Sequence, residues 1–177
     1  MMRLLRRLGR DRRGVSAVEF ALIAPAMIAF YFGLAEITQA LLAERRAGHA
    51  ASAIGDLVAQ SSTITNSEVS DIFEIAGTIM RPYPTTTLKM RVTSVSANAG
   101  GATTVDWSNA QGGLTAYSPG AAITVPSGVI AANQSVIVSE VQYAYDSPVD
   151  FFMPNAVTFD RKFYLRPRKS DRVTKSN

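Results

Sequence analysis

The chain has 177 residues, no cysteine and a single histidine. This length has room for one modest domain and an anchor, but not for two full domains. The lack of cysteine excludes disulfides and thiolate metal sites, and a single histidine argues against a Ser-His-Asp triad or a multi-histidine zinc site. We therefore expect neither a metal nor another cofactor, and we expect His49 on a solvated helix face.

The net charge of +4 is unevenly distributed along the chain. Residues 1–14 contain six arginines and one aspartate, a net charge of +5, whereas residues 15–177 contain twelve basic and thirteen acidic side chains, a net charge of −1. A basic chain can indicate a nucleic-acid-binding protein. Here the excess positive charge belongs to a short N-terminal segment, so we expect no nucleic-acid partner.

Residues 15–35 form a long apolar run with one charged side chain, Glu19. As a helix this run would span about 31 Å, close to the roughly 30 Å hydrocarbon core of a bilayer. Arginines crowd its N-terminal side, so the positive-inside rule places residues 1–14 in the cytoplasm and the C-terminal part across the membrane. The pattern predicts a single-pass protein of a bacterial inner membrane, with the lipid bilayer as a partner and a periplasmic domain beyond it.

The apolar run has two other interpretations. A secretory signal peptide could be cut at Ala24-Pro25-Ala26, but Glu19 would interrupt its hydrophobic core and the chain stays apolar through Phe32. An uncleaved signal anchor could instead carry a periplasmic ligand-binding or enzymatic domain. The acidic residues beyond the anchor are scattered, and no phosphate-binding glycine loop or metal-spaced cluster is present in the sequence. A non-enzymatic domain is therefore preferred, with the anchored ligand-binding or enzymatic domain as the alternative.

The charge of Glu19 needs an explanation, because an acid inside a membrane helix is costly and is usually functional. The simpler interpretation is that Glu19 lies near the helix start and reaches back to the lipid headgroups.

Small residues or proline also recur every four positions along the anchor. They form a stripe where another helix can approach closely: Ala17, Ala21, Pro25, Ala29 and Gly33. Pro25 removes one backbone hydrogen bond and should bend the helix.

The helical pattern continues beyond the anchor to about residue 60, and we expect residues 36–60 to be amphipathic and to pack on the periplasmic domain. Its predicted apolar stripe consists of Ile37, Leu41, Ala47, Ala51, Ile54 and Val58. Its predicted polar side consists of Glu44, His49, Ser52 and Asp56.

Residues 61–165 are expected to form an α+β domain. A capping box of Thr65 and Glu68 predicts a second helix over about residues 66–80, ended by Pro82. Strands are predicted at residues 88–96, around Val105 and Trp107, at residues 136–145 and at residues 159–165. The predicted fold class is thus α+β, a long N-terminal helix packed on a small, mainly antiparallel sheet with a second short helix.

Three smaller expectations accompany this domain. Asn109 to Gly113 is predicted to be a turn region, and Lys89 and Arg91 are predicted to be solvated. Residues 166–177 form a basic C-terminal tail that we expect to be solvated, with binding to acidic headgroups or to a partner protein as the alternative.

Two regions together resemble the TadE-like pseudopilins of tight-adherence (Flp) pilus systems. The first reads Arg12-Arg13-Gly14-Val15-Ser16-Ala17-Val18-Glu19-Phe20-Ala21-Leu22, a basic leader and a glycine five positions before a glutamate. The second is the Tyr143-Ala144-Tyr145 end of the last long apolar strand, followed by a proline. The N-terminal motif is specific, whereas the Tyr-x-Tyr strand is weak on its own.

The resemblance implies a minor, structural pilus component that a prepilin peptidase cuts between Gly14 and Val15, with Glu19 and Phe20 taking part in recognition. Glycine suits such a cut because its backbone can extend into a peptidase cleft without a side chain. The α-amine released on Val15 could pair with Glu19 of a neighbouring subunit and lower the desolvation cost of both charges. Implied partners are the peptidase, other pilins and pseudopilins, and the inner-membrane assembly platform. Whether the chain is TadE-like or TadF-like stays open, because both share this N-terminus.

Overall fold

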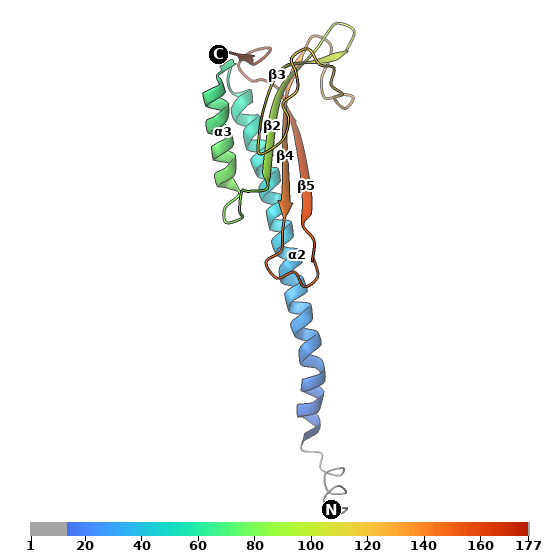
Figure 1. Cartoon of the computed structure of the whole chain (residues 1–177). Coiled ribbons are helices and arrows are strands. Elements are labelled where there is room, and N and C mark those ends of the chain that lie inside the picture. Colours follow the sequence, from blue (N-terminus) through green and yellow to red (C-terminus); the bar gives the residue numbers. More distant parts are fainter. Residues whose placement is uncertain (1–13, 177) are drawn as a thin grey trace, which may run out of the picture.

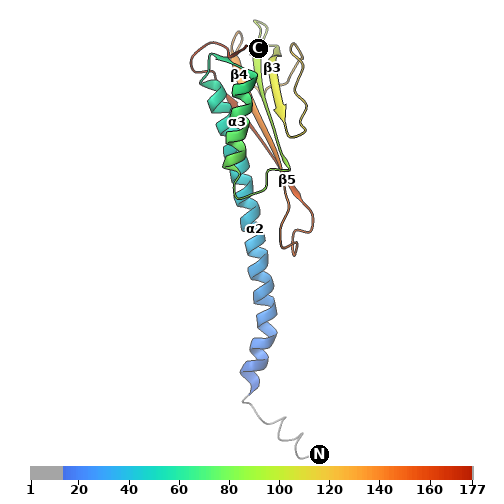
Figure 2. The same cartoon turned by 60° about the vertical axis from the view of Figure 1, so that its left-hand side comes forward.

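One long helix organises the structure, a computed structural model that describes residues 14–176 (Figure 1). Helix α2, Val15–Ala59, is 45 residues long and is continuous through Pro25. Its N-terminal part projects from the rest of the molecule, whereas its C-terminal part packs against helix α3 and a sheet in both views (Figures 1 and 2). Burial along α2 begins at Gly33, and every side chain before it is exposed or only partly covered. The helix therefore has a bare half and a packed half.

The sheet has four antiparallel strands in the order β3-β2-β4-β5. The strands are β2 (Leu88–Ala97), β3 (Thr103–Gln111), β4 (Ser135–Tyr145) and β5 (Val157–Leu165). The four predicted strands and the α+β fold class are confirmed. The turn predicted at Asn109–Gly113 is wrong in its first three residues, because these continue β3 and pair with β2. The chain turns at Gly112, which has a φ of +76° and lies against the backbone of Leu88.

Helix α3 (Asn66–Ile79) begins with the predicted capping box. The Thr65 backbone N–H donates to Glu68 Oε2 at 2.7 Å, and the Glu68 backbone N–H donates to Thr65 Oγ1 at 3.2 Å. These bonds satisfy backbone donors that the first turn of a helix leaves without partners. The helix buries Val69, Ile72, Phe73 and Ala76, while Glu68, Asp71 and Glu74 face outward.

The packed half of α2 buries a face made mostly of small residues. The buried residues are Gly33, Glu36, Ala40, Ala43, Ala47, Ala50, Ala51, Ile54, Gly55, Val58 and Ala59. The predicted apolar stripe is correct from Ala47 onward, but Ile37 and Leu41 are 52% and 50% exposed. Small side chains let the sheet approach closely, and at Gly55 an added Cβ would clash with Leu165. The bulkier Ile37 and Leu41 therefore lie on the open side of the helix, whereas His49 is exposed as predicted.

The two faces of the sheet are covered by different parts of the chain. Ile137, Val141, Tyr143 and Tyr145 of β4 belong to the core shared with α2 and α3. The alternating residues Val136 and Val138 face the opposite side. There they pack with Val95 and with residues of the connection between β3 and β4, namely Ile123, Val125, Val129 and Ile130.

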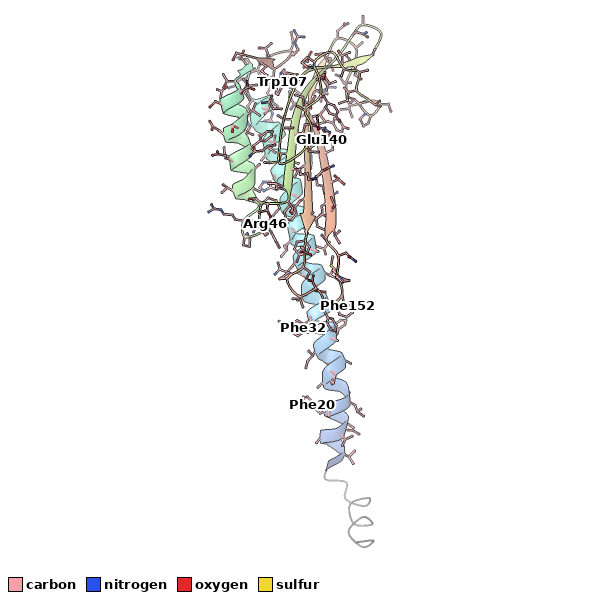
Figure 3. The ribbon with its side chains drawn as sticks, viewed as in Figure 1. Phe20, Phe32, Arg46, Trp107, Glu140 and Phe152 are labelled. Carbon is pink, nitrogen blue, oxygen red and sulfur yellow. The ribbon has the colours of Figure 1, made fainter. Side chains whose placement is uncertain are left out.

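The expectation of a solvated C-terminal tail is correct for most of its basic residues, since Arg166, Arg168, Lys169 and Arg172 are exposed, but it is wrong from Val173 onward. Strand β6 (Thr174–Lys175) pairs in parallel with strand β1 (Thr63–Ile64), and Val173 is fully buried. The Trp107 indole Nε1–H donates to the Val173 carbonyl at 2.8 Å. A buried indole N–H requires an acceptor, and the returning tail supplies it near the end of α2 that is remote from the bare half (Figure 3).

Candidate membrane anchor and assembly site

The predicted processing site lies at the start of the described chain, where Gly14 is the N-cap of α2 and Val15 is its first residue. Within residues 14–176, and apart from its chain neighbours and the nearby helix backbone, no heavy atom lies within 4 Å of where a Gly14 Cβ would stand. Gly14 and Val15 are both exposed in this part of the chain. The leader before it, including Arg12 and Arg13, lies outside the described residues.

Glu19 and Phe20 follow on the first turns of the bare half, and both are exposed. Figure 3 shows Phe20 pointing away from the helix. In the described part of the chain, Glu19 has neither a hydrogen bond nor an ion pair. A carboxylate in an apolar setting needs a compensating partner, and residues 14–176 supply none for Glu19. The roles of both residues stay predictions.

The predicted stripe of small residues divides into two parts. Ala17, Ala21 and Pro25 are exposed and Ala29 is partly covered, so this part is open to another helix. Gly33 is instead buried beneath Phe152 of the same chain. In this structure Gly33 serves contact within the chain, and a role in packing between subunits stays a prediction for the other four residues.

Glu36 holds the second carboxylate of the helix, and sequence reasoning missed its role. Glu36 is 2% exposed, at the point where α2 meets the loop between β4 and β5, residues 146–156. The backbone N–H of Phe151 donates to Glu36 Oε1 at 2.8 Å, and that of Phe152 donates to Oε2 at 2.7 Å. The Ser147 hydroxyl donates to Oε1 at 2.9 Å. Three donors from one loop therefore satisfy both carboxylate oxygens.

The loop geometry explains why Glu36 is held as a charged group. Asp150 has a φ of +51°, and the next two backbone N–H groups converge on the carboxylate, an arrangement that favours anions. Burial raises the pKa of Glu36, but the backbone N–H groups of Phe152 and Phe151 and the Ser147 hydroxyl lower it, so the pKa lies below its ordinary value of 4.5. The available signal was its position as the first acid after the apolar run.

A second missed cluster lies on the other face of the sheet, where Arg91, Glu140 and Lys162 stand opposite one another on three adjacent strands. Arg91 Nε donates to Glu140 Oε2 at 2.6 Å, and Lys162 Nζ lies 2.5 Å from Glu140 Oε1. Burial raises the pKa of Glu140, but hydrogen bonds and charge interactions with Arg91 and Lys162 bring it below the ordinary value. Arg91 is therefore largely buried, contrary to prediction, while Lys89 is exposed as predicted.

Arg91 also holds the β3–β4 connection on the sheet. Its Nη1 donates to the Thr115 carbonyl at 2.8 Å, and its Nη2 donates to the Tyr117 hydroxyl at 2.7 Å. The guanidinium carbon lies 3.9 Å from the centre of the Tyr117 ring, within the range of a cation–π contact. The cluster is thus a structural contact between the sheet and its covering segment.

The alternative of an enzymatic or ligand-binding domain requires acidic residues gathered in a cavity. A groove of about 240 Å³ is lined by Glu140 and Asp160, but Glu140 is already paired with two cations. A groove of about 550 Å³ beside α3 has Glu74 as its one acidic residue. Across residues 14–176 no group of three or more His, Asp or Glu side chains could hold a metal ion.

Comparisons with known proteins address the N-terminal part of the chain. Among the described residues, α2 is the one helix long and apolar enough to cross a membrane. No curated protein and no solved structure matches this chain. Residues 14–55 match the model of a protein family described as TadE-like protein, a segment that contains Gly14, Glu19 and Glu36. The resemblance to TadE-like proteins is thereby confirmed, and it associates the chain with Tad pilus systems and with a structural family not known for enzymatic activity.

Proposed function

We propose that this chain is a minor pseudopilin, a membrane-anchored structural subunit needed for the assembly of Tad (Flp) pili. The observation that carries the proposal is the bare half of α2 within the segment that matches the TadE-like family. It combines an exposed apolar surface with a carboxylate, Glu19, that has no partner among residues 14–176, and with an exposed glycine at its start. A surface of this kind suits lipid and other helices better than water.

The length of the bare half supports its role as the membrane span. Residues 15–32 would extend about 27 Å as a helix, and the packed half then begins close to the far edge of the roughly 30 Å hydrocarbon core. With the arginine-rich leader in the cytoplasm, the α+β domain lies in the periplasm. The covered face of the packed half holds that domain directly on the continuation of the anchor.

The proposed processing site lies at the start of α2. A prepilin peptidase cuts between Gly14 and Val15, which removes the basic leader and leaves an α-ammonium group on Val15. Glu19 lies one helical turn away from this group, near the same end of the helix. In an assembly the Val15 ammonium of one subunit meets the Glu19 carboxylate of another, with Phe20 and the stripe of Ala17, Ala21, Pro25 and Ala29 at the surrounding helix contact.

Coexpression with a prepilin peptidase tests the processing step. The expected product begins at Val15 and is shorter by the 14 residues of the leader, as read by N-terminal sequencing and intact mass. Gly14→Leu should leave the full-length precursor. Gly48→Ala is the matched control, because an added Cβ there makes only an ordinary contact with Arg161. A wild-type chain that still begins with Met1 beside an active peptidase would refute processing.

The role of Glu19 is tested in piliated cells. Glu19→Ala and Glu19→Gln should both be processed but should assemble poorly, because each removes the charge that meets the α-ammonium group. Asp71→Ala changes an exposed acid on α3 and should assemble normally. The readouts are the amount of surface pili and the recovery of the processed subunit with its assembly partners. Normal piliation in both Glu19 variants would refute the role assigned to that residue.

A further inference from the structure

The loop between β4 and β5 exposes apolar side chains beside the bare half of α2. Phe151 and Phe152 are 60% and 55% exposed, and Val149 is also exposed. Two exposed phenylalanines on an otherwise well-packed domain mark a contact surface. In both views this loop is the part of the α+β domain that reaches furthest toward the bare helix (Figures 1 and 2).

The position of the loop along α2 is fixed by a direct contact. Phe152 covers Gly33, and a Cβ added to Gly33 would lie 2.6 Å from the Phe152 ring. Figure 3 places Phe152 close to the level of Phe32 on the helix. Gly33 is the first buried residue after the bare half, whose length of about 27 Å nearly equals the hydrocarbon thickness. The two rings therefore lie where the bilayer ends on the domain side.

The loop is held in this position rather than hanging freely. Glu36 accepts hydrogen bonds from the backbone N–H groups of both phenylalanines, so the backbone that carries the rings is tied to the helix. The two rings pack edge to face with centroids 4.8 Å apart. A preorganised aromatic pair can enter an interface without a large further loss of conformational entropy.

The surroundings of the pair match a lipid interface. On the helix at the same level, Phe30, Tyr31 and Phe32 are also exposed. The loop rings thus continue the apolar surface of the anchor instead of forming an isolated patch. The acidic side chains of the loop, Asp146 and Asp150, are exposed and can stay among headgroups and water.

We propose that the β4–β5 loop is a second membrane contact, in which Phe151 and Phe152 insert into the periplasmic lipid interface beside α2. This inference rests on the proposed function insofar as α2 must span the membrane. A helix alone leaves the domain free to rotate about the helix axis relative to the bilayer. A lateral contact on one side of the helix restricts the tilt of the anchor and sets which face of the domain lies against the membrane.

The absence of native cysteine allows a direct measurement on the full chain. Single cysteines carrying a nitroxide label are introduced at Phe151, at Phe20 in the anchor and at Ser62 beyond the remote end of α2. Each protein is placed in phosphatidylcholine vesicles, and the label is exposed to oxygen, which concentrates in lipid, and to a water-soluble nickel chelate. The expected result is lipid-type accessibility for Phe20→Cys and Phe151→Cys and water-type accessibility for Ser62→Cys.

The outcomes separate the two proposals. Lipid-type accessibility at position 20 with water-type accessibility at position 151 overturns the loop contact and leaves the anchor intact. Water-type accessibility at position 20 overturns both the membrane span and the loop contact. If protein rather than lipid covered position 151, the label there would be shielded from both reagents. This result would also overturn the proposal.

A second variant keeps both aromatic rings in place. A label on Val149→Cys should be shielded from the nickel chelate relative to Ser62→Cys, because the intact rings hold the loop in the interface. The shielding should be lost when Phe151→Ser and Phe152→Ser are added, whereas Phe163→Ser, an exposed change on β5, should leave it unchanged. Persistent shielding in the double serine variant would overturn the assignment to these two rings.

Discussion

The two halves of α2 differ in what surrounds their small residues and their carboxylates. The packed half buries a face of alanine and glycine against its own sheet, whereas the bare half presents similar small residues to its surroundings. Each half also carries a carboxylate in or beside the apolar run, Glu19 in the bare half and Glu36 at the start of the packed half. Glu36 is satisfied by three donors of its own chain, while within residues 14–176 Glu19 has no partner. The difference shows that one half of the helix is covered by its own domain, whereas the other half stays exposed within the described residues.

The largest expected contrast comes from deleting one apolar side chain in each half. Ile54→Ala removes a fully buried side chain and should lower the free energy of unfolding by about 2–5 kcal/mol. Ile23→Ala makes the same chemical change on the bare half and should leave the unfolding of the domain unchanged. Denaturant unfolding in mild detergent, followed by the fluorescence of Trp107, measures both. Equal effects would contradict the division of the helix.

The second contrast compares the two carboxylates. Glu36→Ala leaves the N–H groups of Phe151 and Phe152 without an acceptor, so the loop should detach and the melting temperature should fall. Hydrogen exchange at these two amides should accelerate far more than exchange in β4. Glu36→Gln retains one acceptor oxygen and should have a smaller effect. Glu19→Ala should change neither quantity, and unchanged loop exchange in Glu36→Ala would contradict the assigned role of Glu36.

Acidification should reduce the difference in melting temperature between wild type and Glu36→Gln. Because the folded-state pKa of Glu36 lies below 4.5, its ionised form stabilises the folded state above that pH, and this contribution is lost as pH falls through the folded-state pKa. The difference in melting temperature between wild type and Glu36→Gln should therefore be largest near pH 7 and shrink below pH 4.5. Glu140 is present in both proteins, so its own lowered pKa does not affect the difference. A constant difference across this range would contradict the prediction.

The smallest effect is expected at Ile37. Since this side chain faces away from the sheet, Ile37→Ala should change the free energy of unfolding by no more than about 0.5 kcal/mol. Val58→Ala, on the buried face of the same half, should cost clearly more. Denaturant unfolding distinguishes the two, and a loss at Ile37 as large as that at Val58 would restore the stripe predicted from sequence.

The features predicted correctly are those encoded locally. The capping box joins residues three positions apart, and the predicted strand at residues 136–145 is a run of consecutive residues that favour strands. The prediction is wrong for the N-terminal part of the packed half, because Ile37 and Leu41 fit an apolar stripe as well as Ala40 and Ala43 do. Periodicity cannot choose between two faces when both are apolar; the close approach of the sheet chooses the smaller side chains.

The missed contacts join residues far apart in the chain. Glu36 meets Phe151 and Phe152 across more than one hundred residues, and Trp107 meets Val173 across 66. The partners are backbone N–H and C=O groups, which every residue except proline possesses in full, so residue types give no signal for the pairing. The anchor, by contrast, was visible because its length and its lone acid are properties of consecutive residues.

The row of Arg91, Glu140 and Lys162 has a consequence for how the strands find their alignment. Side chains alternate between faces, so a shift of β4 by one residue would turn Glu140 toward the apolar core on α2 and separate it from both cations. An unpaired carboxylate there would be strongly disfavoured. The correct alignment is thus selected against its nearest misfolded competitors, in the part of the sheet where valines alone would tolerate slippage.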